Sequence, residues 1–262
     1  MAKLSNENPT GRFSGLQELY ARHRPSYPAE AIDFIIQRCG LNSTTKLVDV
    51  GCGTGISTRL FAARGIPVVG IEPNEAMLTK AVAAETEGDN QPTYFRGTAE
   101  ETRMPAACAT AVLAAQAFHW FDAAKALREF HRILRPGGHA VLMWNERDPA
   151  DPFTADYGMV IRSVPGAAEV EGPCGRAGEV ILCSPLFEQA DLTVFKNQQE
   201  LNEEGVVGRA LSASYAPREP AAVEAFTAAL KEVFARYQRD GRSVLHYVTS
   251  VYIGRRREVV AS

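Results

Sequence analysis

The sequence lacks the cysteine pattern of a disulfide framework or a zinc site. Among its 262 residues the cysteines number five, an odd count, and none belongs to a C-x-x-C motif. They are Cys39, Cys52, Cys108, Cys174 and Cys183. This usage favours reduced thiols in a cytoplasmic protein and predicts no metal site.

The chain also lacks a strong charge of one sign and a long apolar run. Lysine and arginine number 28 against 31 aspartates and glutamates, and this balance does not favour nucleic acid as a partner. The most apolar stretch, 106–121, is too short to span a bilayer, and the polar residues 1–11 predict no signal peptide. We therefore expect no nucleic-acid or membrane partner, and the sequence leaves the oligomeric state open.

What the chain does contain is a glycine-rich turn after an apolar run. Residues 47–50 are followed by Gly51, Gly53 and Gly55 at every second position. Glycine has no Cβ, so the backbone can bend sharply or let a ligand lie against it. Residues 57–64 then have helical character. Strand, glycine turn and helix are typical of the start of a nucleotide-type site in an open α/β sheet.

The spacing of the glycines narrows the choice of cofactor. A dinucleotide fingerprint needs G-x-G-x-x-G, but position 56 is Ile56, and no Lys-Ser or Lys-Thr pair follows as in a P-loop. A second apolar strand, 67–71, ends at Glu72, which lies 21 residues after Gly51. A carboxylate at about this distance accepts hydrogen bonds from ribose hydroxyls.

The glycine turn and the second acid together resemble the class I S-adenosylmethionine (SAM)-dependent methyltransferases. The resemblance implies that Asp49 and the three glycines hold the methionine part of SAM. It also implies that Glu72, with Pro73 beside it, holds the ribose. Met77 could contact the adenine, although a methionine at helical spacing is equally often a core residue.

Two further segments resemble a small-molecule subgroup that includes the trans-aconitate type. In that subgroup an aromatic residue and an arginine upstream of the sheet close over SAM, which implies roles for Tyr20 and Arg24. After the third strand, the family reads adenine through Thr98, Ala99 and Glu100 of this chain. Many relatives carry Asp where this chain has Thr98, so the backbone N–H of Ala99 is the stronger expectation.

The most specific match is the string 114–121 at the carboxyl end of the fourth strand, the edge where open α/β sheets bind ligands. The resemblance implies that Gln116 lies beside the methionine part and that His119 and Trp120 face the cleft. His119 is the candidate catalytic residue because its unperturbed pKa lies near neutrality. It could act as a base toward a hydroxyl, orient a carboxylate, or be a hydrogen-bonded structural residue.

The alternation of apolar strands and helical stretches predicts an α/β fold with a doubly wound, seven-stranded, mostly parallel sheet of the Rossmann-like methyltransferase type. The expected strands are 46–50, 68–72, 93–96, 109–115, 139–144, 192–201 and 243–253, the last two as an antiparallel pair. The expected helices are 28–38, 57–64, 74–86, 123–134, 152–164, 202–214 and 219–239. We expect one domain over 1–262, with a helical cap at about 10–30, a cofactor-binding core at about 31–147, and a lid with the strand pair at about 148–256.

The resemblance and the lid composition together predict transfer of a methyl group to a small organic acceptor, at the oxygen of a carboxylate or hydroxyl. Aromatic side chains in and near the lid indicate a closed pocket. The candidate acceptor-binding residues are Trp120, Trp144, Tyr157 and Tyr215, and Arg162 and Arg209 are the cations of interest for an anionic acceptor.

Other functions stay open at this point. A nicotinamide oxidoreductase would share the first strand, the glycine turn and Glu72, but Ile56 disfavours it. A non-catalytic SAM-binding protein would keep the glycine turn and lack an acceptor pocket. A macromolecule methyltransferase is disfavoured because the chain has neither an Asn/Asp-Pro-Pro-Tyr string nor a basic face.

Overall fold

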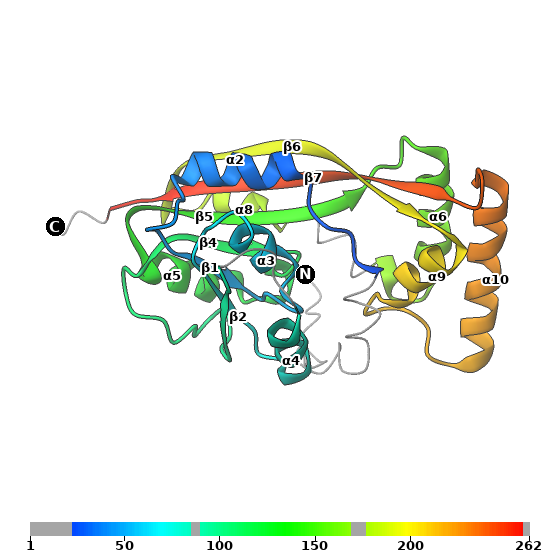
Figure 1. The fold of residues 1–262 in the computed structure, drawn as a ribbon, viewed down its shortest axis with the longest axis horizontal. Helices are drawn as coiled ribbons and strands as arrows, with labels where there is room; N and C mark the ends of the chain where they lie inside the picture. Colours follow the sequence, from blue (N-terminus) through cyan, green and yellow to red (C-terminus); the bar gives the residue numbers. More distant parts are fainter. Residues whose placement is uncertain (1–22, 85–89, 169–176, 259–262) are drawn as a thin grey trace.

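A seven-stranded sheet of order β3-β2-β1-β4-β5-β7-β6 runs through the computed structural model (Figure 1). The structure describes residues 23–84, 90–168 and 177–258. Strands β1 to β5 are parallel, and β7 is antiparallel to both β5 and β6. The strands are β1 (Leu47–Val50), β2 (Val68–Ile71), β3 (Thr93–Phe95), β4 (Ala109–Ala115), β5 (Leu134–Arg147), β6 (Phe187–Leu201) and β7 (Ser243–Arg256). The predicted fold class, with its terminal antiparallel pair, is confirmed.

The helices begin largely where the sequence places capping residues. Asn74, predicted as a cap, accepts a hydrogen bond from the backbone N–H of Met77, and Asp122 caps the next long helix in the same way. The helices are α2 (Ala29–Cys39), α3 (Ile56–Ala62), α4 (Glu75–Ala83), α5 (Ala123–Ile133), α6 (Pro152–Arg162), α8 (Glu179–Leu182), α9 (Glu203–Leu211) and α10 (Pro220–Tyr237), with a 3-10 turn η1 (Phe118–Trp120). No helix within the described ranges is long and apolar enough to cross a membrane.

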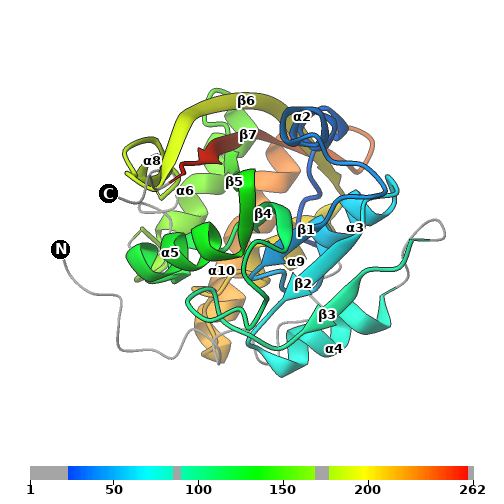
Figure 2. The same cartoon turned by 90° about the vertical axis from the view of Figure 1, so that its left-hand side faces the viewer.

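Successive side chains of a strand point to opposite sides of the sheet, and helices cover both sides of the central strands, so both faces are buried. Val48 and Val50 of β1 join the apolar cluster that contains α5 and α8 residues. Leu47 joins the cluster that contains α2 and α3 residues. Figure 2 shows these two helix pairs on opposite sides of the sheet. The carboxyl ends of the parallel strands are therefore the edge at which a ligand can enter the fold.

Strands β5, β6 and β7 extend beyond their predicted bounds. Strand β5 begins at Leu134 and not at residue 139, because Leu134 already pairs with Ala109 and the residues that follow form an irregularity inside the strand. Strand β6 begins at Phe187 and not at residue 192, because its early residues pair with Arg255 and Arg256 of β7.

Strands β5, β6 and β7 are 14, 15 and 14 residues long and extend well past β1 and β2, which have four residues each. Helices α6, α9 and α10 gather at the far end of these long strands (Figure 1). There they form a separate apolar cluster with Leu245 and Tyr247 of β7. We call these three helices the lid.

Candidate active site

The glycine turn after β1 has the backbone conformation that only glycine adopts readily. Gly51 and Gly53 have φ values of 71° and 57°, in the left-handed region. A Cβ on Gly51 would lie 2.7 Å from the Cβ of Ala117 and 3.0 Å from the ring of Phe121. The loop after β4 therefore closes on the glycine turn, and Gly51 cannot be enlarged without moving one of them.

Asp49 stabilises this turn from within the protein. Its side chain is fully buried, and Oδ2 accepts hydrogen bonds from Ser57 Oγ at 2.7 Å and Thr58 Oγ1 at 2.6 Å. Burial raises the pKa of Asp49 to about 6, although the hydrogen bonds from Thr58 and Ser57 lower it. The carboxylate thus ties β1 to the start of α3, and its Oδ1 atom has no hydrogen-bond partner among the described residues. Asp49 does not line the adjoining cavity directly, and its contact with the methionine part stays a prediction.

Glu72, at the end of β2, joins two loops of the site. Its carboxylate accepts hydrogen bonds from the backbone N–H of Gly53 at 3.0 Å and of Asn74 at 2.9 Å. Burial raises the pKa of Glu72, and these backbone hydrogen bonds counteract it. Each carboxylate oxygen keeps lone-pair capacity toward the cavity, which is the requirement for accepting hydrogen bonds from ribose hydroxyls.

A cavity of about 230 Å³ lies against the glycine turn and the carboxyl ends of β1, β2 and β4. Most of the predicted cofactor residues line it: Arg24, Gly51, Gly53, Glu72, Pro73, Met77, Thr98, Ala99, Glu100 and Gln116. Gly55 does not line it and instead precedes α3 with a φ of 78°. Tyr20 lies outside the described residues. We call this space the cofactor cavity.

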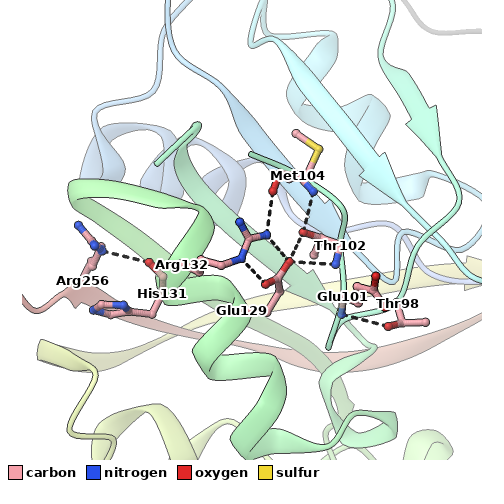
Figure 3. A network of polar contacts seen from close by, with 8 residues as sticks. All are labelled: Thr98, Glu101, Thr102, Met104, Glu129, His131, Arg132 and Arg256. Carbon is pink, nitrogen blue, oxygen red and sulfur yellow. Dashed lines mark hydrogen bonds and ion pairs between the residues drawn. The ribbon is translucent and has the colours of Figure 1, made fainter. Parts of the chain in front are cut away.

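The loop that was predicted to read adenine is fixed to helix α5. Glu129 of α5 accepts hydrogen bonds from the backbone N–H and hydroxyl of Thr102 and from Arg132 (Figure 3). Burial raises the pKa of Glu129, but the hydrogen bonds from Arg132 and Thr102 outweigh it and lower that pKa. The Thr98 hydroxyl accepts from the backbone N–H of Glu101 at 3.2 Å, so its role is to shape the turn. The wall of the cofactor cavity is thereby held in place.

Gln116 has an unusual backbone at the end of β4. Its φ is 53°, which non-glycine residues rarely adopt, and its backbone N–H donates to Met143 O at 2.8 Å. The side-chain Nε2 donates to the backbone oxygen of Asn145 at 3.2 Å. Its Oε1 atom is buried without a hydrogen-bond partner among the described residues. An orphaned acceptor on a strained residue at a ligand edge is a feature of binding sites.

A second cavity of about 280 Å³ adjoins the first, between the end of β5 and the lid. Its lining includes the predicted residues His119, Trp120, Trp144, Tyr215, Arg162 and Arg209. Arg24, Gln116, Trp120 and Asn145 line both cavities. Tyr157, predicted as an acceptor contact, does not line it and lies fully buried beneath Arg147, whose guanidinium is 5.6 Å from the ring centre. We call this space the acceptor cavity.

His119 belongs to the 3-10 turn after β4. Trp144 Nε1 can only donate, and it lies 3.4 Å from His119 Nδ1, so this geometry assigns Nδ1 as the acceptor and places the proton of the neutral ring on Nε2. Burial, together with the charge of Arg24, lowers the pKa of His119 to about 4. The ring is therefore neutral at physiological pH.

Asn145 lines both cavities, whereas the sequence offers it only as one member of a candidate recognition segment, 144–148. Its Oδ1 accepts from Thr249 Oγ1 at 2.6 Å and from Asn197 Nδ2 at 3.1 Å. Its own Nδ2 donates to Ser26 O at 3.1 Å, which fastens the N-terminal segment to β5. The available signal was a polar residue directly after the apolar run of β5, at the ligand edge of the sheet.

The cofactor cavity has the donors and acceptors that SAM requires. The glycine turn brings exposed backbone close to the ligand space, Glu72 can accept from ribose hydroxyls, and the Gln116 Oε1 acceptor has no partner within the protein's described part. Met77, Ala99 and other apolar side chains can cover a flat base. Fold and cavity together define a class I SAM-dependent methyltransferase.

Comparisons with known proteins agree with this class. Residues 48–142 match the family described as a methyltransferase domain. An uncharacterized methyltransferase of Mycobacterium tuberculosis (strain H37Rv) is 34% identical over 219 residues, which are 82% of each chain. The chain belongs to the SAM-dependent methyltransferases, and the nicotinamide oxidoreductase alternative is thereby excluded.

Other relatives match smaller parts or the fold alone. A ubiquinone biosynthesis O-methyltransferase of Pseudomonas paraeruginosa is 35% identical over 120 residues, or 45% of this chain and 51% of that protein. A solved structure of a candidate type II methyltransferase from Anaeromyxobacter dehalogenans shares the fold with a TM-score of 0.63. It is 21% identical and covers 89% of this chain and 97% of that one.

Proposed function

We propose that the protein transfers the methyl group of SAM, bound in the cofactor cavity, to an oxygen of a small organic molecule bound in the acceptor cavity. The observation that carries this proposal is the shared wall: Arg24, Gln116, Trp120 and Asn145 line both spaces. Two ligands on either side of these residues would meet there. A non-catalytic SAM-binding protein has no need of a second cavity at that point.

The chemistry asks little of the protein beyond alignment. SAM supplies a methyl group on a sulfonium, so transfer to oxygen breaks the carbon–sulfur bond, leaves the electron pair on sulfur and needs no further activation. Holding the two partners near attack distance can contribute about 7–11 kcal/mol for ideal alignment. The residues between the cavities would position the acceptor oxygen, and the lid would exclude water from it.

The state of His119 favours a carboxylate oxygen over a hydroxyl. A hydroxyl nucleophile must lose a proton, and a general base works best with a pKa near the operating pH. With a pKa of about 4, His119 is a poor base at neutral pH. Its Nε2–H can instead donate a hydrogen bond that orients an oxygen already ionised. We propose this positioning role for His119, and a hydroxyl acceptor stays the second candidate.

The O-methyltransferase name of the Pseudomonas relative supports oxygen as the methylated atom, over the part of the chain that matches. That relative's activity concerns its own substrate. The trans-aconitate type of acceptor stays a prediction from the sequence resemblance. A small acceptor is supported by the volume of the acceptor cavity, about 280 Å³, which a macromolecular segment would exceed unless the lid opened.

Labelled methyl transfer tests the proposal directly. The protein would be incubated with methyl-labelled SAM and a panel of small organic acids and phenols, and labelled products would be separated. Methyl esters of carboxylates release labelled methanol in mild base, whereas methyl ethers do not. We expect base-labile label. Binding of SAM by calorimetry without transfer to any acceptor would favour a non-catalytic protein, and base-stable label would identify a hydroxyl acceptor.

A further inference from the structure

The acceptor cavity is strongly cationic. Four arginines line it, Arg24, Arg147, Arg162 and Arg209, against a single acidic residue among its described lining, Glu146. The Glu146 carboxylate accepts a hydrogen bond from Ser250 Oγ at 3.1 Å. Arg162 is exposed at the lid, whereas Arg209 of α9 is 5% exposed. Arg209 is therefore the cation that water solvates least.

Arg209 has no acidic counterpart in the part of the chain that the structure describes. No ion pair among the described residues involves the Arg209 guanidinium, although exposed lysines and arginines elsewhere form several. Its Nε atom is buried without a hydrogen-bond partner in those ranges. The last turn of a helix stabilises a cation only partly. A buried charge without a partner is costly, so a bound anion is the expected complement.

The groups around Arg209 are suited to receive such an anion. Three tyrosines surround the charge of Arg209, namely Tyr247, Tyr157 and Tyr215, and Tyr247 is hydrogen-bonded to it. Tyr215 and Tyr247 line the acceptor cavity with Arg209. The Tyr157 hydroxyl is also buried without a hydrogen-bond partner in the described structure. Tyr157 does not line the cavity, and the Tyr247 hydroxyl donates to Gln199 Oε1 at 3.4 Å. The Arg209 guanidinium, which can only donate, is therefore the group of this set best suited to an anion in the cavity.

We propose that Arg209 binds an anionic oxygen group of the methyl acceptor, a carboxylate or a phosphate ester, and thereby sets acceptor specificity. This inference rests on the proposed function, because it assigns the substrate of that same cavity. Arg209 lines the acceptor cavity but not the cofactor cavity. The anion bound to it would therefore lie away from the residues that line both cavities. The planar fork of arginine matches two oxygens of such a group in a way that lysine cannot.

The test uses matched pairs of anionic and neutral probes. Protein saturated with S-adenosylhomocysteine would be titrated by calorimetry with benzoate against benzamide, glutarate against glutaramide, and phenyl phosphate against phenol. We expect at least one anion to bind ten-fold or more tightly than its neutral counterpart. The carboxylate and phosphate arms identify which anion the cavity takes.

Variants then assign the preference to Arg209. In Arg209→Met the preference should disappear, and in Arg209→Lys it should fall several-fold, because charge stays but the fork is lost. Lys231→Met is the matched control, since Lys231 is an exposed lid cation that pairs with Glu203. S-adenosylhomocysteine affinity should be unchanged in all three.

Equal binding of neutral and anionic probes by the wild type, or a preference that survives in Arg209→Met, would overturn the inference. Should Arg209→Met fail to fold, an undiminished preference in Arg209→Lys would overturn it. Methyl transfer to neutral acceptors alone would refute the role of Arg209 and leave the proposed function standing. Failure to bind SAM would refute the proposed function itself.

Discussion

The cofactor cavity and the acceptor cavity share a wall but are built in different ways. Apart from residues of the N-terminal segment and Asn145, the cofactor cavity is lined from one stretch of chain, residues 51–121. The acceptor cavity is lined by Arg24, by His119 and by the end of β5. Residues of α6, residues 209–215 at and after the end of α9, and Tyr247 of β7 also line it. The methyltransferase family match, 48–142, covers the stretch 51–121 of the cofactor cavity and ends before the lid helices. The cofactor cavity is thus formed mainly by residues that are close in sequence, whereas the acceptor cavity forms only when distant segments pack together.

The two sites also differ in how their charges are satisfied. Around the cofactor cavity, the carboxylates of Asp49 and Glu72 accept hydrogen bonds from hydroxyls or backbone N–H groups of the turn itself. In the acceptor cavity, Arg209 has no described carboxylate partner. Asp49 and Glu72 likewise form no ion pair among the described residues, and Asp49 Oδ1 has no hydrogen-bond partner there. The two cavities therefore present buried charges of opposite sign to their ligands, negative beside the cofactor cavity and positive in the acceptor cavity. Four variants can break or sharpen this comparison.

The largest effect is expected for Gly51→Ala. The new Cβ would lie 2.7 Å from that of Ala117, at a φ of 71° that strains any other residue. Either the turn or the loop after β4 must move, and we expect SAM affinity by calorimetry to fall about 100-fold, or roughly 3 kcal/mol. Gly65→Ala is the control: its φ is 78° but its Cβ would meet open space. It should leave SAM affinity unchanged and cost about 1–2 kcal/mol of stability. Similar losses of SAM affinity in both variants would contradict a steric cause.

The contrast between a cofactor cavity formed by one stretch of chain and an acceptor cavity formed by distant segments explains which features the sequence could predict. Gly51 and Glu72 were identifiable because strand, turn and acid follow one another at fixed spacing, and the sheet follows from the alternation of apolar strands with helices. The hydroxyl partners of Asp49 on α3 could not be predicted from its position at the end of a strand, and its contact with the cofactor stays a prediction. Asn145 could not be singled out within the candidate segment 144–148, because its importance depends on Ser26 and Thr249, which are distant in sequence.

The pH dependence of the free energy of unfolding can test the buried charge of Asp49 beside the cofactor cavity. The pKa of Asp49 is raised to about 6 from 3.8, so the folded state holds a proton there that the unfolded chain releases. Stability is therefore lost as pH rises from about 4 to about 6, by roughly 3 kcal/mol, and stays at that lower level above pH 6. In Asp49→Asn this loss should be absent. The pKa of Glu72 is also raised, chiefly by burial and in smaller part by the charge of Asp49, so Glu72 contributes a smaller loss in Asp49→Asn than in the wild type. Parallel stability curves for the two proteins in urea would show that Asp49 is not the group responsible.

Glu72 should separate donor binding from acceptor binding. Glu72→Gln keeps the shape of the side chain but loses a charged acceptor for ribose hydroxyls, worth about 1.5–3 kcal/mol. We expect SAM affinity to fall about 10- to 100-fold, with the anion preference of the acceptor cavity unchanged. Because Glu72 also holds the N–H groups of Gly53 and Asn74, thermal unfolding must be measured alongside. Unchanged SAM affinity would remove Glu72 from the ribose site.

The smallest effect is expected at His119, close to the wall where the two cavities meet. Since its pKa is lowered to about 4, the ring stays neutral from pH 5 to 8, and the methyl transfer rate should not fall as pH drops through that range. His119→Gln keeps a hydrogen-bond donor and should retain most turnover, whereas His119→Ala should lose about ten-fold, comparable to one neutral hydrogen bond. Neither should alter SAM affinity, because His119 lines the acceptor cavity and not the cofactor cavity. A rate that declines below pH 6.5 in the wild type but not in His119→Gln would instead identify a general base, and with it a hydroxyl acceptor.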